Sequence, residues 1–94
     1  MIMEKIEKEL TVVNKKGLHA RPAAMFVGLV EKYNVSATLS KGEEKVNGKS
    51  IMGILMLAAV EGTVLKVNVE GENAAAAMVE IEKFFSKQEE ELFS

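Results

Sequence analysis

The residues best suited to chemistry lie side by side at positions 19 to 22, which hold the only histidine, the only arginine and the only proline of the chain. An imidazole nitrogen is a nucleophile and proton acceptor near neutral pH. A guanidinium pairs with phosphate oxygens through a planar fork of donors. His19 with Arg21 close by therefore suits the transfer of an anionic group such as a phosphoryl group.

A helix that begins within this stretch would turn it into an anion site. Pro22 has a fixed φ and no amide hydrogen, which places it in the first turn of a helix, and it pushes Arg21 away from the α region. We expect the helix to begin around Ala20 to Pro22, with His19 at or just before its N-terminus, and Gly17 to allow a tight turn ahead of it. The backbone amides of the first turn and the positive helix end then favour a bound anion and a neutral imidazole.

The same stretch has a plainer interpretation. A lone histidine near a helix start is most often a solvent-facing cap, and proline is a common helix opener. With one histidine and no cysteine, the chain offers neither a thiol nucleophile nor a recognisable metal site.

Composition narrows the class of protein. The chain has 94 residues, which predicts one small domain spanning residues 1–94. Its net charge is −2, with lysines and acids mixed along the sequence, so the basic stripe of a nucleic-acid binder is not seen. The longest apolar run, at 51–60, is roughly half of what a bilayer requires, which argues against membrane insertion. The first ten residues lack the apolar core of a secretory signal, so we expect a cytoplasmic protein.

Apolar periodicity predicts strands at 8–13, 35–40, around 45–46 and 63–71. It predicts helices from about 20 to 34, after Ser50 and after Asn73, with the Asn73 side chain as a candidate cap of the last helix. The order β-α-β-β-α-β-α favours an α+β fold with three helices covering one face of a four-stranded antiparallel sheet. Residues 87–94 should fray or extend the last helix. The residues expected in the core are Leu10, Val12, Ala23, Phe26, Val27, Val30, Val35, Ala37, Leu39, Ile54, Leu57, Leu65, Val67, Val69, Ala74, Ala77, Met78, Ile81 and Phe85.

Two motifs carry a family resemblance. The stretch "GLHARPAA" at 17–24, followed by "VNGKSIMG" at 46–53, resembles HPr, the histidine-containing phosphocarrier family of the bacterial sugar phosphotransferase system. The resemblance covers essentially the whole chain and implies the open-faced β-sandwich of that family.

The resemblance implies a role for each residue of the first motif. His19 would accept a phosphoryl group on Nδ1 from phospho-Enzyme I, which obtains it from phosphoenolpyruvate, and would pass it to a IIA domain. Arg21 would neutralise the phosphoryl oxygens, and the amides of Ala20 and Arg21 would donate to them. The protein would be a stoichiometric intermediate and not an enzyme, without cofactor or metal, and a monomer suits such a shuttle.

The second motif gives Ser50 two interpretations. From the residues alone Ser50 is a helix N-cap. By resemblance it matches the serine that an ATP-dependent HPr kinase/phosphorylase modifies in many bacteria. A phosphate there would be compatible with the helix but hostile to an acidic partner surface.

The apolar run after Ser50 is too uniform for a short helix to bury completely. By resemblance, Ile51, Met52 and Leu55 match the patch on which Enzyme I and IIA proteins dock. We expect Ile54 and Leu57 to lie in the core instead.

Two features depart from the sugar-type pattern. Gly28 and Glu31 stand where many of these carriers have basic residues, which weakens steering toward acidic partners, and close packing against the sheet is one explanation for Gly28. The run "ILMLAA" at 54–59 looks more like carriers of nitrogen-related regulatory branches, in which the acceptor is a regulatory IIA protein.

Two other classes of function were compared with a carrier. A regulatory interaction module switched by phosphorylation of Ser50 remains an alternative, although family members of that type would be expected to lack the histidine. An RNA-binding sandwich would need stacking aromatic side chains on the central strands, and those strands carry none.

Overall fold

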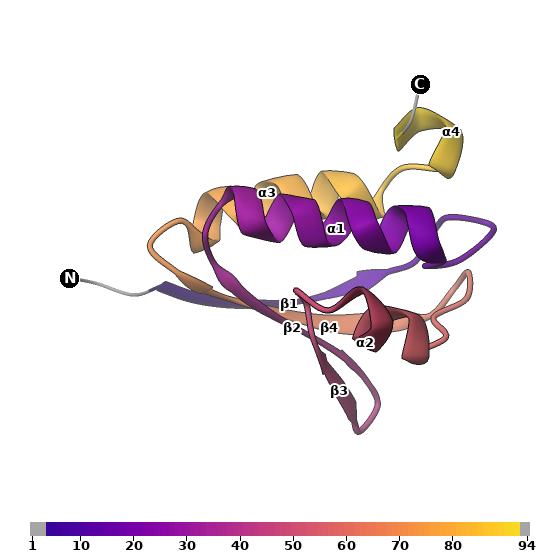
Figure 1. Cartoon of the computed structure of the whole chain (residues 1–94), viewed down its shortest axis with the longest axis horizontal. Coiled ribbons are helices and arrows are strands. Elements are labelled where there is room, and N and C mark those ends of the chain that lie inside the picture. Colours follow the sequence, from indigo (N-terminus) through magenta and orange to yellow (C-terminus); the bar gives the residue numbers. More distant parts are fainter. Residues whose placement is uncertain (1–3, 93–94) are drawn as a thin grey trace.

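The computed structural model describes residues 4–92, whose strands form one antiparallel sheet in the order β1-β4-β2-β3 (Figure 1). Helices pack on one face of this sheet and share a single core with it, so the predicted α+β open-faced fold is confirmed. The elements are β1 (Glu4–Thr11), α1 (Ala20–Lys32), β2 (Ser36–Lys41), β3 (Glu44–Asn47), α2 (Ile51–Met56), β4 (Val64–Gly71), α3 (Ala74–Phe85) and α4 (Glu89–Leu92).

The central strands show the predicted alternation of buried and solvent-facing side chains. Leu39 of β2 pairs with Val67 of β4, and both side chains are fully buried. One residue further along, Thr38 pairs with Asn68 on the opposite, polar face of the sheet. Because side chains alternate along a strand, one face of β2 and β4 supplies the core and the other remains open.

The helices bury the stripes expected from their periodicity. Every predicted core residue of α1 and α3 is buried. Three aromatic rings join the two helices: the centroids of Phe84 and Phe85 are 5.4 Å apart, and Phe26 lies 5.8 and 6.2 Å from them. These tilted and edge-on contacts fix α1 against the C-terminal half of α3.

The ends of the chain differ from expectation. The first strand begins at Glu4, where it pairs with Gly71, and ends at Thr11, so the expected range of 8–13 is wrong at both ends. Charged residues around Ile6 hide its period-two signal. After Phe85 the chain turns and forms the separate helix α4 instead of extending α3, which gives a fourth helix. Residues 93 and 94 of the predicted tail lie outside the described range.

Two local expectations are also wrong. Asn73 stands at the N-cap position of α3, but its side chain does not cap the helix and instead donates to the Tyr33 carbonyl at 3.0 Å. Gly28 is exposed, and a Cβ atom added there would meet nothing within 4 Å, so close packing against the sheet does not explain it.

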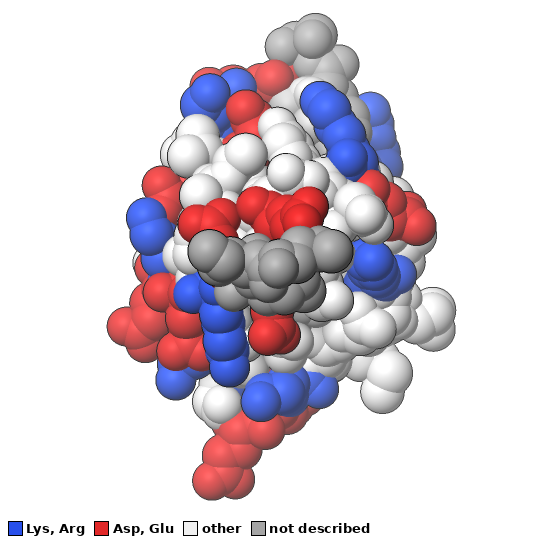
Figure 2. All heavy atoms as spheres, turned by 90° about the vertical axis from the view of Figure 1, so that its left-hand side faces the viewer, with Lys and Arg blue, Asp and Glu red and all other residues white. Residues whose placement is uncertain are grey.

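The polar character of the surface agrees with the composition. Figure 2 shows the side of the molecule at the left of Figure 1, where acidic and basic side chains are interleaved. Within residues 4–92 no helix has the length and apolar character needed to cross a membrane.

Candidate functional site

His19 occupies the N-cap position of α1, as predicted. Its backbone is extended, with φ −90° and ψ −168°, and its side chain makes no capping hydrogen bond. The first helical hydrogen bond runs from the Ala23 amide to the His19 carbonyl at 2.9 Å. The amides of Ala20 and Arg21 precede that bond and lie in the turn whose donors have no acceptor within the helix. This is the geometry that favours an anion beside His19.

Arg21 lies inside the helix, as its second residue, so the expectation that Pro22 forces it out of the α region is wrong. Pro22 is the third helical residue, where its missing amide hydrogen removes no helical bond. Its ring is fully buried. Burial of the ring offsets the local steric preference of the preceding residue, and the exposed Arg21 side chain starts from the first turn of α1.

The loop before His19 is held by a buried asparagine that sequence reasoning missed. Asn14 is only 6% exposed, and its side chain donates to the Gly17 carbonyl at 3.2 Å and accepts from the Lys16 amide at 3.3 Å. The Gly17 amide donates to the Asn14 carbonyl at 2.9 Å. An asparagine three residues before a glycine is a local turn signal that could have identified it.

Gly17 has a positive φ of 72°, which confirms the tight turn expected there. A Cβ atom at this position would lie 2.6 Å from the Ala59 carbonyl oxygen. The same oxygen accepts from the Leu18 amide at 2.9 Å. Glycine is therefore required both for its conformation and for the close approach of the segment that follows α2.

This approach creates an open depression beside His19. Leu55 of α2 lines it together with His19, so the structure brings one predicted docking residue to the histidine. Ser50, Ile51 and Met52 do not line it. The depression is lined by Lys16, Leu18, His19, Leu55, Ala58, Ala59 and Val60.

Ser50 begins α2 as its N-cap, as expected from the residues alone. Its hydroxyl accepts from the Gly53 amide at 3.0 Å. Ile51 is 40% exposed and Met52 is 68% exposed, so part of the apolar run does face solvent. Ile54 and Leu57 are buried in the core as predicted, whereas Leu55 is only partly buried against it.

The apolar surface extends beyond the predicted patch. Met56 is 74% exposed and Val60 is 66% exposed, and neither was selected from the sequence. The C-terminal end of α2 is fixed by Lys41, whose Nζ donates to the Leu57 carbonyl at 3.1 Å. Ala58 follows with φ 50°, a left-handed conformation that turns the chain toward the depression.

No group of three or more metal-ligating side chains is assembled within residues 4–92. The groups near His19 that suit an anion are the amides of the first turn of α1 and the cationic side chains of Lys16 and Arg21. Together with His19 they place a nucleophilic nitrogen at an anion-favouring helix end.

A histidine followed by an arginine at the start of a helix is an arrangement that suits a phosphoryl carrier. Comparison with known proteins identifies the family. The family model described as "PTS HPr component phosphorylation site" matches residues 6–87. The chain belongs to the HPr family of phosphocarriers of the phosphotransferase system.

Individual relatives agree with this assignment. The chain is 45% identical over 83 residues to the phosphocarrier protein HPr of Xylella fastidiosa (strain Temecula1), covering 88% of this chain and 93% of the relative. The crystal structure of HPr from Bacillus anthracis superposes with a TM-score of 0.81 at 34% identity, over 86% of this chain and 96% of that one. The Bacillus subtilis catabolite repression protein Crh, a domain-swapped dimer, superposes with a TM-score of 0.70 at 35% identity, over 92% and 94% of the two chains.

Proposed function

We propose that the protein accepts a phosphoryl group on Nδ1 of His19 from phospho-Enzyme I and transfers it to a histidine of a IIA domain. The observation that carries this proposal is the position of His19 at the N-cap of α1, beside the amides of Ala20 and Arg21. In the transfer, the imidazole lone pair forms a bond to phosphorus while the bond to the donor histidine breaks. The donor nitrogen keeps that electron pair.

The charge of the transferred group explains the neighbouring residues. Its oxygens would receive hydrogen bonds from the amides of Ala20 and Arg21, and the Arg21 guanidinium would neutralise them. Since these donors are fixed by the helix, they need little reorganisation when the group arrives. Transfer in the reverse direction uses the same contacts, as a carrier requires.

The partner surface proposed for Enzyme I and IIA domains consists of Ile51, Met52 and Leu55. Leu55 borders the depression that contains His19, while Ile51 and Met52 are exposed on α2. Methionine and aliphatic side chains can adapt to several partners in turn. The sugar branch and a nitrogen-related branch would share this chemistry and differ only in the IIA acceptor.

A second candidate function rests on Ser50. Its hydroxyl is at the start of α2, directly before Ile51 and Met52, so a phosphate added by an HPr kinase/phosphorylase would stand beside the proposed docking surface. That would make the protein a regulatory module in addition to a carrier. We propose a monomer for the carrier, and size measurement in solution would separate it from a dimer of the kind described for Crh.

Incubation with Enzyme I, Mg²⁺ and phosphoenolpyruvate, followed by intact-mass measurement, tests the carrier function. We expect the mass of one phosphoryl group to be gained, to disappear after brief acid treatment, and to be absent in folded His19→Ala. Labelling of His19→Ala would show that another residue is the acceptor. No labelling of the wild type by an Enzyme I from the same organism would move the assignment to the regulatory module.

A further inference from the structure

The C-terminal segment returns to the loop that precedes His19. The Gln88 side chain accepts a hydrogen bond from the Lys15 amide at 3.1 Å through Oε1 and donates one to the Val13 carbonyl at 2.7 Å through Nε2. These partners are 73 and 75 residues away in sequence. One amide side chain therefore spans the backbone on both sides of Asn14.

Two amide side chains hold this loop: Asn14, which belongs to it, and Gln88 from the C-terminal segment. Asn14 is buried and bonds to Lys16 and Gly17, as described above. Gln88 binds the backbone groups before and after Asn14, the Val13 carbonyl and the Lys15 amide. Because every carbonyl and amide of a turn moves with its neighbours, a shift at Lys15 would pass through Gly17 to His19 within a few residues.

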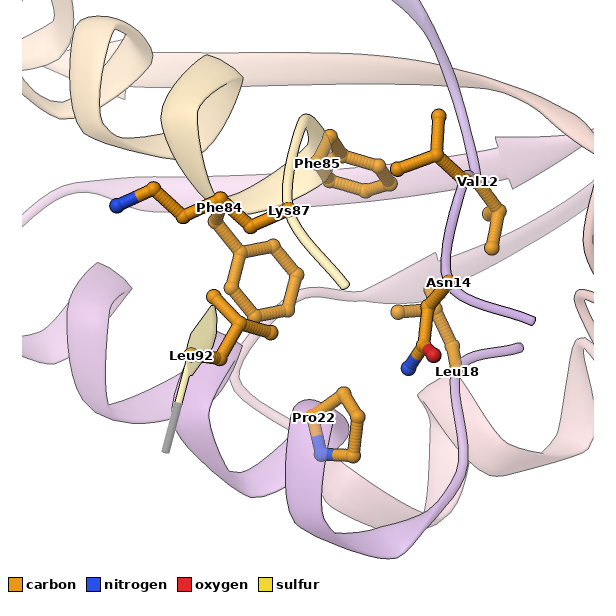
Figure 3. A pocket seen from close by; sticks show the side chains of 9 residues that line it. Val12, Asn14, Leu18, Pro22, Phe84, Phe85, Lys87 and Leu92 are labelled. Atoms are coloured by element: carbon orange, nitrogen blue, oxygen red, sulfur yellow. The ribbon is translucent and has the colours of Figure 1, made fainter. Parts of the chain in front are cut away.

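The C-terminal segment also packs against apolar side chains on both sides of His19 in the sequence. Leu92 of α4 lines a cavity together with Leu18, directly before His19, and Pro22, three residues after it (Figure 3). Phe84 and Phe85 complete this wall from the end of α3. The cavity volume is about 10 Å³, which is at the lower limit for a single water molecule. The region is therefore a packing contact and not a ligand site.

Gln88 also starts the helix that carries Leu92. Its backbone amide donates to a carboxylate oxygen of Glu91 at 3.0 Å, which is half of a capping box. The start of α4 and the attachment to the loop therefore meet at one residue, through the backbone amide of Gln88 and its side chain respectively. In Figure 1, α4 lies at the same end of the molecule as the first turn of α1.

We propose that Gln88 is a positioning residue, which holds the loop from Val13 to Leu18 so that His19 and the first turn of α1 receive the phosphoryl group. This inference deepens the proposed carrier function and rests on it. Gln88 makes no contact with the reacting nitrogen and acts through the loop backbone. The proposed docking residues on α2 are not involved, so the effect should appear in turnover more than in partner binding.

The test compares Gln88→Ala with a matched control, Asn73→Ala. Asn73 is also an amide side chain that bonds a distant backbone carbonyl, that of Tyr33, where the C-terminal end of α1 meets the start of α3. Asn73→Ala loses one tertiary hydrogen bond from an amide side chain to the backbone, and Gln88→Ala loses two. Only the bonds lost in Gln88→Ala lie at the loop that precedes His19.

Two measurements distinguish the effect of Gln88 on the loop from its effect on phosphoryl transfer. Hydrogen exchange of the Lys15 amide should become roughly five-fold faster in Gln88→Ala and stay unchanged in Asn73→Ala. With the carrier as substrate of Enzyme I, Gln88→Ala should lower kcat by about three- to ten-fold, because small displacements of a reacting group are costly. KM should change by less than about two-fold, since the docking surface is intact.

The outcomes distinguish the two levels of the proposal. A phosphorylated wild type with unchanged kcat in Gln88→Ala, or an equal loss in Asn73→Ala, overturns the role of Gln88 alone. Unchanged hydrogen exchange of the Lys15 amide overturns the claim that Gln88 holds the loop. A wild type that takes up no phosphoryl group overturns the carrier function and, with it, the role assigned to Gln88.

Discussion

Two helices of this molecule begin with a side chain in the same position, and the two side chains have different tasks. His19 and Ser50 are the N-caps of α1 and α2, and both have extended backbones. The Ser50 hydroxyl accepts from the Gly53 amide, whereas the His19 side chain takes no part in capping. A capping oxygen stabilises the fold, while the imidazole at the same place does not cap and is the group for which we propose phosphoryl transfer.

The difference follows from what else stabilises each helix. The helix α1 has 13 residues and buries five of them, so packing supplies its stability without a capping side chain. The helix α2 has six residues and buries only Ile54. A helix so short depends on its ends, which are fixed by Ser50 at the start and by Lys41 on the Leu57 carbonyl. A long, well-packed helix can carry a reactive residue at its first position at little cost.

The largest loss of stability is expected from a substitution at Gly17, in the tight turn that precedes His19. In Gly17→Ala, the new methyl group meets the Ala59 carbonyl oxygen at 2.6 Å in a backbone with φ 72°. We expect a loss of about 2–4 kcal/mol in the free energy of unfolding, from the strained φ and the forced movement together. Denaturant unfolding would measure it.

Gly42→Ala is the matched control, because Gly42 has φ 60° but a Cβ atom there meets nothing within 4 Å. Its loss should be limited to about 1–2 kcal/mol, the cost of the left-handed conformation alone. Equal losses in the two variants would contradict the importance of the contact between the His19 loop and Ala59.

The second prediction concerns a negative charge added at the start of α2 and its effect on the rate of phosphorylation. Ser50→Asp keeps a good N-cap and places a carboxylate beside Ile51 and Met52. We expect phosphorylation by Enzyme I to slow by about ten-fold if the partner surface is acidic, with unfolding little changed. Rates measured at low and high salt would report the electrostatic origin.

The control for charge is Ser50→Asn, which is similar in size to Ser50→Asp, caps equally well and is neutral. Its rate should stay within about two-fold of the wild type. Slowing of both variants to the same extent would assign the effect to shape and would confine the native Ser50 to capping.

The features of the site that the sequence predicted are those determined by residues close together in the chain. Pro22 marks the first turn of α1, and Ser50 marks the start of α2, because a cap or a missing donor acts within one turn. Alternation in β4 was also visible, since each side chain of a central strand faces either the core or solvent.

The parts that sequence reasoning missed depend on distant contacts. Gln88 meets the His19 loop across more than 70 residues, and no local pattern records that meeting. Arg21 was misplaced for a related reason, because burial of the Pro22 ring outweighs a local steric preference. Ala58 has a left-handed backbone, which is unusual for alanine and could not be predicted from its residue type.

The smallest expected effect compares the two N-caps directly, through the free energy of unfolding instead of the rate of phosphoryl transfer. Ser50→Ala removes the oxygen that accepts from the Gly53 amide, so the free energy of unfolding should fall by about 1 kcal/mol. His19→Ala removes a side chain that does not cap and should change it by less than about 0.5 kcal/mol. Thermal melts should show the same order, with a difference of about 4–8 °C for 1 kcal/mol in a domain of this size. A loss in His19→Ala as large as in Ser50→Ala would mean that His19 also stabilises the fold, and the division of labour between the two helix starts would not hold.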